Sequence, residues 1–211
     1  MLLMIYIQIV GCGTFVISTV FMGVWLRIHP SKRTAETTSR IIHGITVVTY
    51  ILPLLIGIFY PGLKHYDVLL GIPLIQFSLV FVAVGAIILP IGIFFIAATM
   101  LALGDRGQGQ PGFFLTKKVV DTYPFKFTRN PGSLGFYLLL LSLALFSSSF
   151  SFTMWLLLVL IPAHTFHLRF FEELELELRF GQSYIEYRNR VPFLIPKIRR
   201  STRKKYVNSK A

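Results

Sequence analysis

The sequence predicts an all-α integral membrane protein with about five transmembrane helices, of which the last two form a C-terminal hairpin that continues into a cytoplasmic helical tail. Hydrophobic residues make up 54% of the 211 residues, against about 45–50% in soluble domains. Several apolar runs approach or exceed the roughly 20 residues that cross a bilayer. The basic residues, which give a formal net charge of +12, gather between these runs, as they do in cytoplasmic loops.

Composition also argues against two other classes of protein. The positive charge is accompanied by no nucleic-acid recognition motif, so no nucleic-acid partner is expected. The single cysteine, Cys12, lies inside an apolar run. It can form no intrachain disulfide and belongs to no redox motif, so we expect it to contribute to packing.

The first two predicted helices are separated by polar segments. Residues 2–26 are apolar and lack the basic residues that precede a signal-peptide core, which indicates a retained helix. A polar loop is expected at 27–40. Residues 41–60 form the second predicted helix, with Pro53 as a kink, and a loop is expected at 61–68.

The third apolar run, 69–103, is too long for one straight crossing and short for two. A single crossing places the basic loops 27–40 and 104–130 on the same side of the membrane, in agreement with the positive-inside rule. We therefore expect one long helix that starts after Pro73 and bends at Pro90, preceded by a short interfacial segment.

A helical hairpin is expected from two apolar runs, 138–146 and 152–171, which flank the uncharged turn Ser147–Ser151. With this hairpin, every Lys and Arg except Lys64 lies on the cytoplasmic side. The N-terminus is then outside and the C-terminus inside.

Beyond the membrane, the fifth helix is expected to continue to Gly181, and a short amphipathic helix is expected from Tyr184 to Val191. Arg169, Glu173 and Glu177 are spaced one turn apart, so we expect them to pair along one face.

Two groups of residues flank the predicted hairpin and carry a recognisable pattern. In chain order they are Tyr123-Pro124-Phe125-Lys126-Phe127-Thr128-Arg129-Asn130-Pro131 and Gly135, then Glu172-Glu173, Leu176, Phe180-Gly181, Tyr184, Tyr187, Val191-Pro192 and Ile195-Pro196. The ordered combination resembles the membrane-embedded methyltransferases that include isoprenylcysteine carboxyl methyltransferase and the phospholipid methyltransferases. The chain departs from the family pattern at Tyr123, Phe125, Asn130 and Ser133, where the pattern has Gly, Tyr, His and Tyr.

The resemblance implies S-adenosylmethionine as the cofactor and a lipidic methyl acceptor, and it implies no metal. The activity it implies is most like isoprenylcysteine carboxyl methylation, with phospholipid amine methylation as the alternative. The implied catalytic residues are Asn130 and Arg169, although Arg169 can equally pair with Glu173. The implied cofactor-binding residues are Tyr123, Pro124, Phe125, Arg129, Asn130, Pro131, Gly135, Glu172 and Glu173.

The residue types agree with this cofactor on physical grounds. S-adenosylmethionine carries a sulfonium, an ammonium, a carboxylate and an adenine, so its site needs acids, an arginine or a helix N-terminus, and aromatic surface. Pro131 suits the first turn of the next helix, whose free N–H groups can receive an electron-rich group. The expected units are three N-terminal helices at 1–103, a methyltransferase core at 104–196 and a basic tail at 197–211.

Two other functional classes remain open from the sequence. The C-terminal half also looks related to sterol-type reductases, which use a nicotinamide cofactor but are much longer chains. A non-catalytic membrane scaffold is the second alternative, because Tyr123 and Ser133 replace pattern residues. His164 and His167 have the spacing of a metal pair, but without further nearby ligands polar packing is the preferred interpretation.

Overall fold

The computed structural model describes residues 2–73, 78–105 and 115–196. In these ranges 82% of the residues are helical and no strand occurs, which confirms the all-α prediction. By length and composition, four helices can cross a membrane and a fifth apolar helix is shorter. The four are Leu2–Ile28, Lys32–Tyr60, Leu79–Gly104 and Phe150–Phe180, and the shorter one is Pro131–Ser147. The predicted basic tail and most of the glycine-rich loop before Leu115 lie outside the described residues.

The helices follow one another in the chain in the order below, and η denotes a π-helical turn. They are α1 (Leu2–Ile28), α2 (Lys32–Thr46), η1 (Val47–Ile51), α3 (Leu52–Gly57), η2 (Ile58–Gly62), α4 (Leu63–Leu69), α5 (Leu79–Asp105), α6 (Pro131–Ser147), α7 (Phe150–Trp155), η3 (Leu156–Leu160), α8 (Ile161–His167), η4 (Leu168–Glu172), α9 (Glu173–Phe180) and α10 (Gln182–Arg190). Several of these elements join into two long rods, α2 to η2 and α7 to α9.

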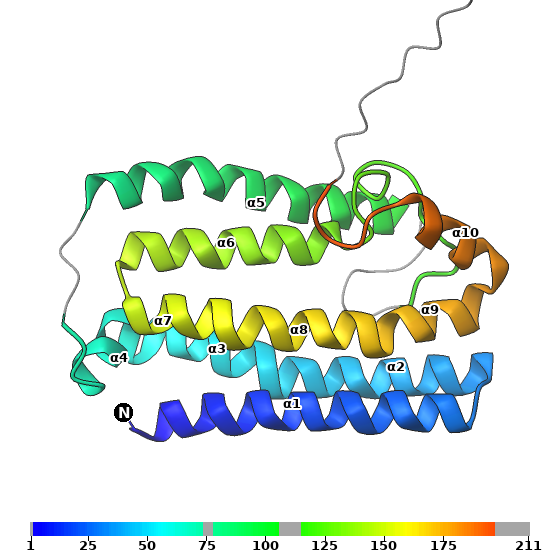
Figure 1. The fold of residues 1–211 in the computed structure, drawn as a ribbon, viewed down its shortest axis with the longest axis horizontal. Coiled ribbons are helices and arrows are strands. Elements are labelled where there is room, and N and C mark those ends of the chain that lie inside the picture. The colour runs from blue at the N-terminus through cyan, green and yellow to red at the C-terminus, as the bar shows by residue number, and fades with distance from the viewer. Residues whose placement is uncertain (1, 74–77, 106–114, 197–211) are drawn as a thin grey trace, which may run out of the picture.

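The rods lie nearly parallel in one bundle (Figure 1). Helix α6 lies between α5 on one side and the rod α7–α9 on the other, and α1 and α2 lie beyond that rod. The turn between α1 and α2 lies at the same end of the bundle as α9 and α10, whereas α4 and the turn between α6 and α7 lie at the opposite end. The predicted hairpin is therefore present, and the motif residues that follow it return to the end at which α6 begins.

The prediction of a polar loop at 27–40 is wrong for most of its length, because α2 begins at Lys32. Ser31 caps this helix, since its hydroxyl accepts a hydrogen bond from the backbone N–H of Thr34 at 3.0 Å. Ala35 is fully buried and packs in one cluster with Leu26 of α1. The polar residues that suggested a loop form the outer face of an amphipathic helix.

The prediction of a loop at 61–68 is also wrong, because most of this segment forms α4. Asp67 is fully buried there. Its carboxylate accepts hydrogen bonds from the backbone N–H groups of Phe150, at 3.1 Å, and Ser151, at 2.7 Å. These groups begin α7 and would otherwise lack partners. The segment is helical because it supplies the partner for the start of another helix.

Two prolines inside the rods follow π-helical turns. Pro53 follows η1 in α3, and Pro162 follows η3 in α8. Proline removes one backbone donor and crowds the preceding turn, and a wider turn accommodates both effects. The Tyr50 hydroxyl also donates to the carbonyl of Leu160 in η3, at 2.9 Å. The predicted kink at Pro53 thus coincides with a change in helical pitch.

Helix α5 begins at Leu79, later than the predicted start after Pro73, and Pro90 lies in its interior. The backbone N–H of Val82 donates to the carbonyl of Ser78 at 3.2 Å, which closes the first turn. The single long helix expected in this region is confirmed, with a later first residue.

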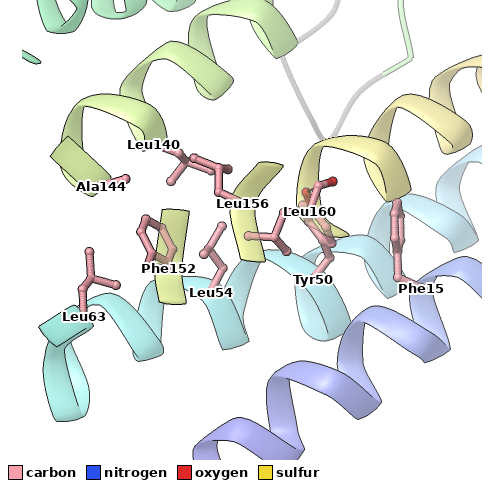
Figure 2. Packing of buried hydrophobic residues seen from close by; sticks show 9 residues of the cluster. All are labelled: Phe15, Tyr50, Leu54, Leu63, Leu140, Ala144, Phe152, Leu156 and Leu160. Carbon is pink, nitrogen blue, oxygen red and sulfur yellow. Dashed lines mark hydrogen bonds between the residues drawn. The ribbon is translucent and has the colours of Figure 1, made fainter. Parts of the chain in front are cut away.

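A hydrophobic core joins the hairpin to the N-terminal helices (Figure 2). It contains side chains from α1, η1, α3, α4, α6, α7 and η3. The buried members are Phe15, Tyr50, Leu54, Leu63, Leu140, Ala144, Phe152, Leu156 and Leu160. This core fixes the rod α7–α9 between α6 and α1, and so determines where the residues at its far end lie.

Candidate active site

The segment before α6 is held by the chain that follows α10. The backbone N–H of Arg129 donates to the carbonyl of Pro192 at 2.9 Å. The hydroxyl of Thr128 and the side-chain amide of Asn130 both donate to the carbonyl of Phe193, at 3.1 and 3.0 Å. Thr128 is fully buried, so these bonds lie away from solvent. The two groups of motif residues, distant in sequence, are therefore in direct contact.

Helix α10 adds a second connection to the same segment. The Tyr187 hydroxyl donates to the carbonyl of Phe125 at 2.9 Å. Burial raises the pKa of Tyr187 and of Tyr184 well above the usual tyrosine value, so both hydroxyls remain protonated donors at neutral pH. The start of the segment is also fixed, because the guanidinium of Arg179 donates to the carbonyl of Thr116.

Arg129 connects the segment to the acidic part of the rod. One of its guanidinium nitrogens lies 2.6 Å from a carboxylate oxygen of Glu173, and the two side chains are only 10% and 15% exposed. The guanidinium also lies 5.5 Å from the centre of the Phe193 ring. A pair this buried is costly to break on one side, because the remaining charge keeps its desolvation penalty.

The predicted row of Arg169, Glu173 and Glu177 is wrong. Arg169 lies in η4, and a π-helical turn holds more residues than an α-helical one, so residues four apart do not align across it. The Arg169 guanidinium instead lies over the Phe193 ring at 4.2 Å, and Glu177 pairs with Arg188 at 2.7 Å. Among the described residues Arg169 forms no ion pair.

A cavity of about 230 Å³ opens beside these contacts. It is bounded by α2, the C-terminal part of α5, the segment 115–133, the end of the rod and α10. The charged residues that line it are Lys118, Arg129, Glu172, Glu173, Glu175 and Arg179, and the uncharged polar residues are Ser39, His43, Thr99, Thr116, Asn130, Ser133, His167, Tyr184 and Tyr187. The site is thus a mixed-charge cavity at the end of the bundle where α6 begins.

Six of the predicted site residues line this cavity. They are Phe125, Arg129, Asn130, Pro131, Glu172 and Glu173. The other four lie nearby but outside its lining. Tyr123 is 45% exposed, with its ring 5.9 Å from that of Phe94, while Pro124 is fully buried. Arg169 faces Phe193, as described above, and Gly135 belongs to a helix interface.

Gly135 permits the close approach of α5 and α6. A Cβ atom on Gly135 would lie 2.7 Å from the carbonyl oxygen of Gly92, and one on Gly92 would lie 2.9 Å from the carbonyl oxygen of Gly135. Small residues at such a crossing let helix backbones pack closely in membranes. The observed surroundings of Gly135 are therefore those of helix packing one turn beyond the cavity.

The acids around the cavity have different partners. Glu173 faces Arg129, and Glu175 accepts a hydrogen bond from Arg179 at 2.6 Å, with both side chains of that second pair at most 5% exposed. Among the described residues, no cation lies within ion-pairing distance of Glu172. Within the described ranges, Glu172 is thus an acid of the cavity without an ion-pair partner.

Sequence reasoning missed the contribution of the N-terminal helices to the cavity. Ser39 and His43 of α2, together with Thr99 of α5, lie outside the motif residues. The sequence carries only a weak indication that these residues belong to a site. Polar side chains spaced one turn apart on an otherwise apolar helix face are costly in a membrane, which suggests a functional role for them. His43 lies within the long rod that starts with α2.

The two histidines of α8 have separate partners. His164 Nδ1 lies 2.8 Å from the hydroxyl of Tyr137, and His167 Nδ1 lies 3.0 Å from the hydroxyl of Thr19. These contacts join α8 to α6 and to α1. Polar packing accounts for both side chains.

The chain was compared with known proteins. Residues 80–183 match the family model described as phospholipid methyltransferase. The matched segment starts at the beginning of α5, contains the whole hairpin and the acidic end of the rod, and ends in α10. No curated protein matches the chain, and no solved structure matches it. Residues 80–183 therefore form a domain of the phospholipid methyltransferase family of membrane methyltransferases, which also includes isoprenylcysteine carboxyl methyltransferase-like proteins.

Proposed function

We propose that this protein transfers a methyl group from S-adenosylmethionine to a lipidic acceptor, and that the cavity beside Arg129 and Glu172 is its active site. The observation that carries the proposal is the convergence of both motif halves on one mixed-charge cavity within a membrane methyltransferase fold. We expect the acceptor to reach this cavity from the bilayer, because α2 and α5, which line it, belong to helices long and apolar enough to cross a membrane.

The residues of the cavity fit the chemical groups of this cofactor. Glu172 supplies a carboxylate for an ammonium group. The first turn of α6 supplies the backbone N–H groups of Gly132 and Ser133 for a carboxylate, because Pro131 has no N–H and that of Asn130 donates to Thr128. Phe125 and Phe180 supply aromatic surface for an adenine ring and for a sulfonium. The buried pair of Arg129 and Glu173 holds α9 against the start of α6.

Methyl transfer from a sulfonium is an in-line displacement that requires no covalent enzyme nucleophile. The protein contributes by aligning the two reactants and by excluding water from the charges involved. The buried side chains of Arg129, Glu175 and Arg179 fix the surroundings of the cavity, as such positioning requires.

Two acceptors remain candidates, the carboxylate of a prenylated cysteine and the amine of a phospholipid. Sequence resemblance favours the carboxylate. Of the residues predicted to act in catalysis, Asn130 lines the cavity and Arg169 faces Phe193. We assign to Asn130 a positioning role, because its amide holds the carbonyl of Phe193 and its backbone begins α6.

The test is a pair of binding experiments followed by a transfer assay on the purified full chain. S-adenosylhomocysteine is expected to bind and to raise the free energy of unfolding by about 2.7 kcal/mol at a hundredfold excess over its Kd. A reduced nicotinamide dinucleotide is expected to cause no shift. Methyl-labelled cofactor should then label a lipid fraction of a native extract. Saturable nicotinamide binding would favour a reductase, and binding of neither cofactor would favour a scaffold.

A further inference from the structure

His43 is a half-buried side chain of α2 that lines the cavity from outside the segment matched by the family. Its Nδ1 atom is buried and has no hydrogen-bond partner among the described residues. A buried polar atom without a partner is destabilising, so such an atom beside a cavity is suited to bind a polar atom of a ligand. Ser39, one turn earlier on α2, lines the same side.

The titratable groups around His43 are engaged elsewhere. From α9, the carboxylate of Glu175 and the guanidinium of Arg179 bind each other. From α8, His167 contacts the hydroxyl of Thr19. From η1, Tyr50 donates to a backbone carbonyl.

The remaining neighbours of α2 add no further charge. Helix α1, which packs against α2, has no titratable residue between Cys12 and Arg27. On the opposite side of the cavity, α5 contributes Thr99 and Leu103. His43 is therefore the nitrogen base available to a ligand on the membrane-helix side of the cavity.

The same part of the cavity indicates which acceptor it suits. The cavity residues that α2 and α5 contribute are Ser39, His43, Thr99 and Leu103, so neither of these two helices supplies a cation for a carboxylate acceptor. A carboxylate acceptor also requires no base. An ammonium acceptor must lose a proton before it can react, and a neutral imidazole is the side chain suited to accept it near neutral pH.

We propose that His43, which lies outside the segment matched by the family, is a catalytic residue that accepts the proton of an amine acceptor. This inference rests on the proposed function. The protonated amine gives one proton to an imidazole nitrogen of His43. Its lone pair then forms a bond to the methyl carbon as the carbon–sulfur bond breaks, and the electron pair of that bond stays on sulfur. The methylated ammonium leaves, and His43 returns its proton to water.

The experiment uses the full chain in vesicles that contain phosphatidylethanolamine, with methyl-labelled S-adenosylmethionine, from about pH 6 to pH 9. For the parent protein we expect kcat/KM to level off above the pKa of His43. For His43→Asn we expect a loss of about 10²- to 10⁴-fold at neutral pH, which is the usual contribution of a general base. The variant should then gain roughly tenfold per pH unit, because only the neutral amine can react.

Two controls separate catalysis from folding. His65→Asn replaces an exposed histidine of α4 at the opposite end of the bundle and should keep the parent pH profile. Binding of S-adenosylhomocysteine to His43→Asn should match the parent, and His43→Gln replaces it if the first variant does not fold.

The outcomes distinguish this inference from the function on which it rests. A His43 variant with the parent pH profile overturns the role of His43 and leaves the methyltransferase function standing. Transfer to a farnesylated cysteine carboxylate but not to phosphatidylethanolamine overturns the amine assignment alone. Absence of both S-adenosylhomocysteine binding and methyl transfer in the parent protein removes the proposed function, and this inference falls with it.

Discussion

At the scale of single residues, Glu172 and Glu173 are neighbours in sequence with different surroundings. Glu173 faces Arg129 at 2.6 Å, whereas Glu172 lines the cavity with no cation beside it among the described residues. Adjacent helical residues point about 100° apart, which explains the division. We expect Glu172→Gln to weaken S-adenosylhomocysteine binding by about ten- to a hundredfold, since it removes one charge-assisted contact of about 1.5–3 kcal/mol. Calorimetric titration measures this change.

Glu173→Gln provides the matched comparison. It leaves the guanidinium of Arg129 buried without a counter-charge, so we expect it to lower the free energy of unfolding by about 3 kcal/mol, the low end for a broken buried pair. Denaturant titration in detergent measures the loss. If both variants bind S-adenosylhomocysteine like the parent, the acids have no part in cofactor binding.

Asp67 gives a second prediction at the residue scale. It is fully buried and accepts two backbone hydrogen bonds at the start of α7, at 3.1 and 2.7 Å. Asp67→Ala leaves two donors unpaired, so we expect a loss of about 1–3 kcal/mol in the free energy of unfolding. S-adenosylhomocysteine affinity should not change, because Asp67 lies at the opposite end of the bundle from the cavity. Lys64→Ala, an exposed position on the same helix, should leave stability unchanged.

At the scale of helices, apolar length was sufficient to predict the elements whose surroundings are lipid or core. The first helix, the long third helix and the hairpin around Ser147–Ser151 all follow from runs of apolar residues. The segments 27–40 and 61–68 were predicted as loops because polar residues occupy them. Both are helical for reasons that a single segment does not reveal, namely packing against Leu26 and capping of α7 by Asp67.

The same limit applies to the candidate site. The residues of the two motif halves could be assigned to one site because their order was recognisable, and six of them line the cavity. Ser39 and His43 could not be assigned, since nothing in sequence places α2 beside the motifs. The ion pairs were also unpredictable, because the π-helical turn at η4 shifts Arg169 away from Glu173. Local pitch depends on packing and is not visible in residue spacing.

The crossing of α5 and α6 yields a prediction at this scale. A methyl group at Gly135 would come within 2.7 to 2.9 Å of the backbone of Gly92 and of Ile96. Backbone atoms cannot yield as a flexible side chain can, so we expect Gly135→Ala to separate the helices and lower stability by about 1–3 kcal/mol. Thermal unfolding in detergent measures the loss. Gly13→Ala, where no atom lies within 4 Å of the added methyl, should have no such effect.

At the scale of the whole molecule, the two ends of the bundle differ in charge. One end holds the turn between α1 and α2, the segment before α6 and α10, and all the lysines and arginines of these elements. The other end holds α4, with Lys64, and the turn between α6 and α7, where the hydroxyl of Ser149 donates to the carbonyl of Leu63 at 3.0 Å. By the positive-inside rule, the cavity end is expected to be cytoplasmic.

Membrane orientation can be tested with single cysteines in a chain whose Cys12 is replaced by alanine. A cysteine at Lys64, which is exposed, should react with an impermeant thiol reagent from outside, whereas Ser148 is buried and would not report its side. Cysteines at Ser31, Gln108 and Ser201 should react only after permeabilisation. Opposite labelling of Lys64 and Ser31 is expected from the structure, because α4, which contains Lys64, lies at one end of the bundle and the start of α2, beside Ser31, lies at the other.

Gln108 is the deciding position in that test, because it follows α5 and precedes the motif segment. If α5 is the third crossing, as its length and apolar surface indicate, its C-terminal end shares a side with Ser31. Labelling of Gln108 from outside, with Ser31 still protected, would require an odd number of crossings between them and would contradict the five-crossing arrangement, which has two. Labelling of both from outside would keep the arrangement and invert it, placing the cavity away from the cytoplasmic supply of S-adenosylmethionine. Protection of both is the result that the distribution of basic residues predicts.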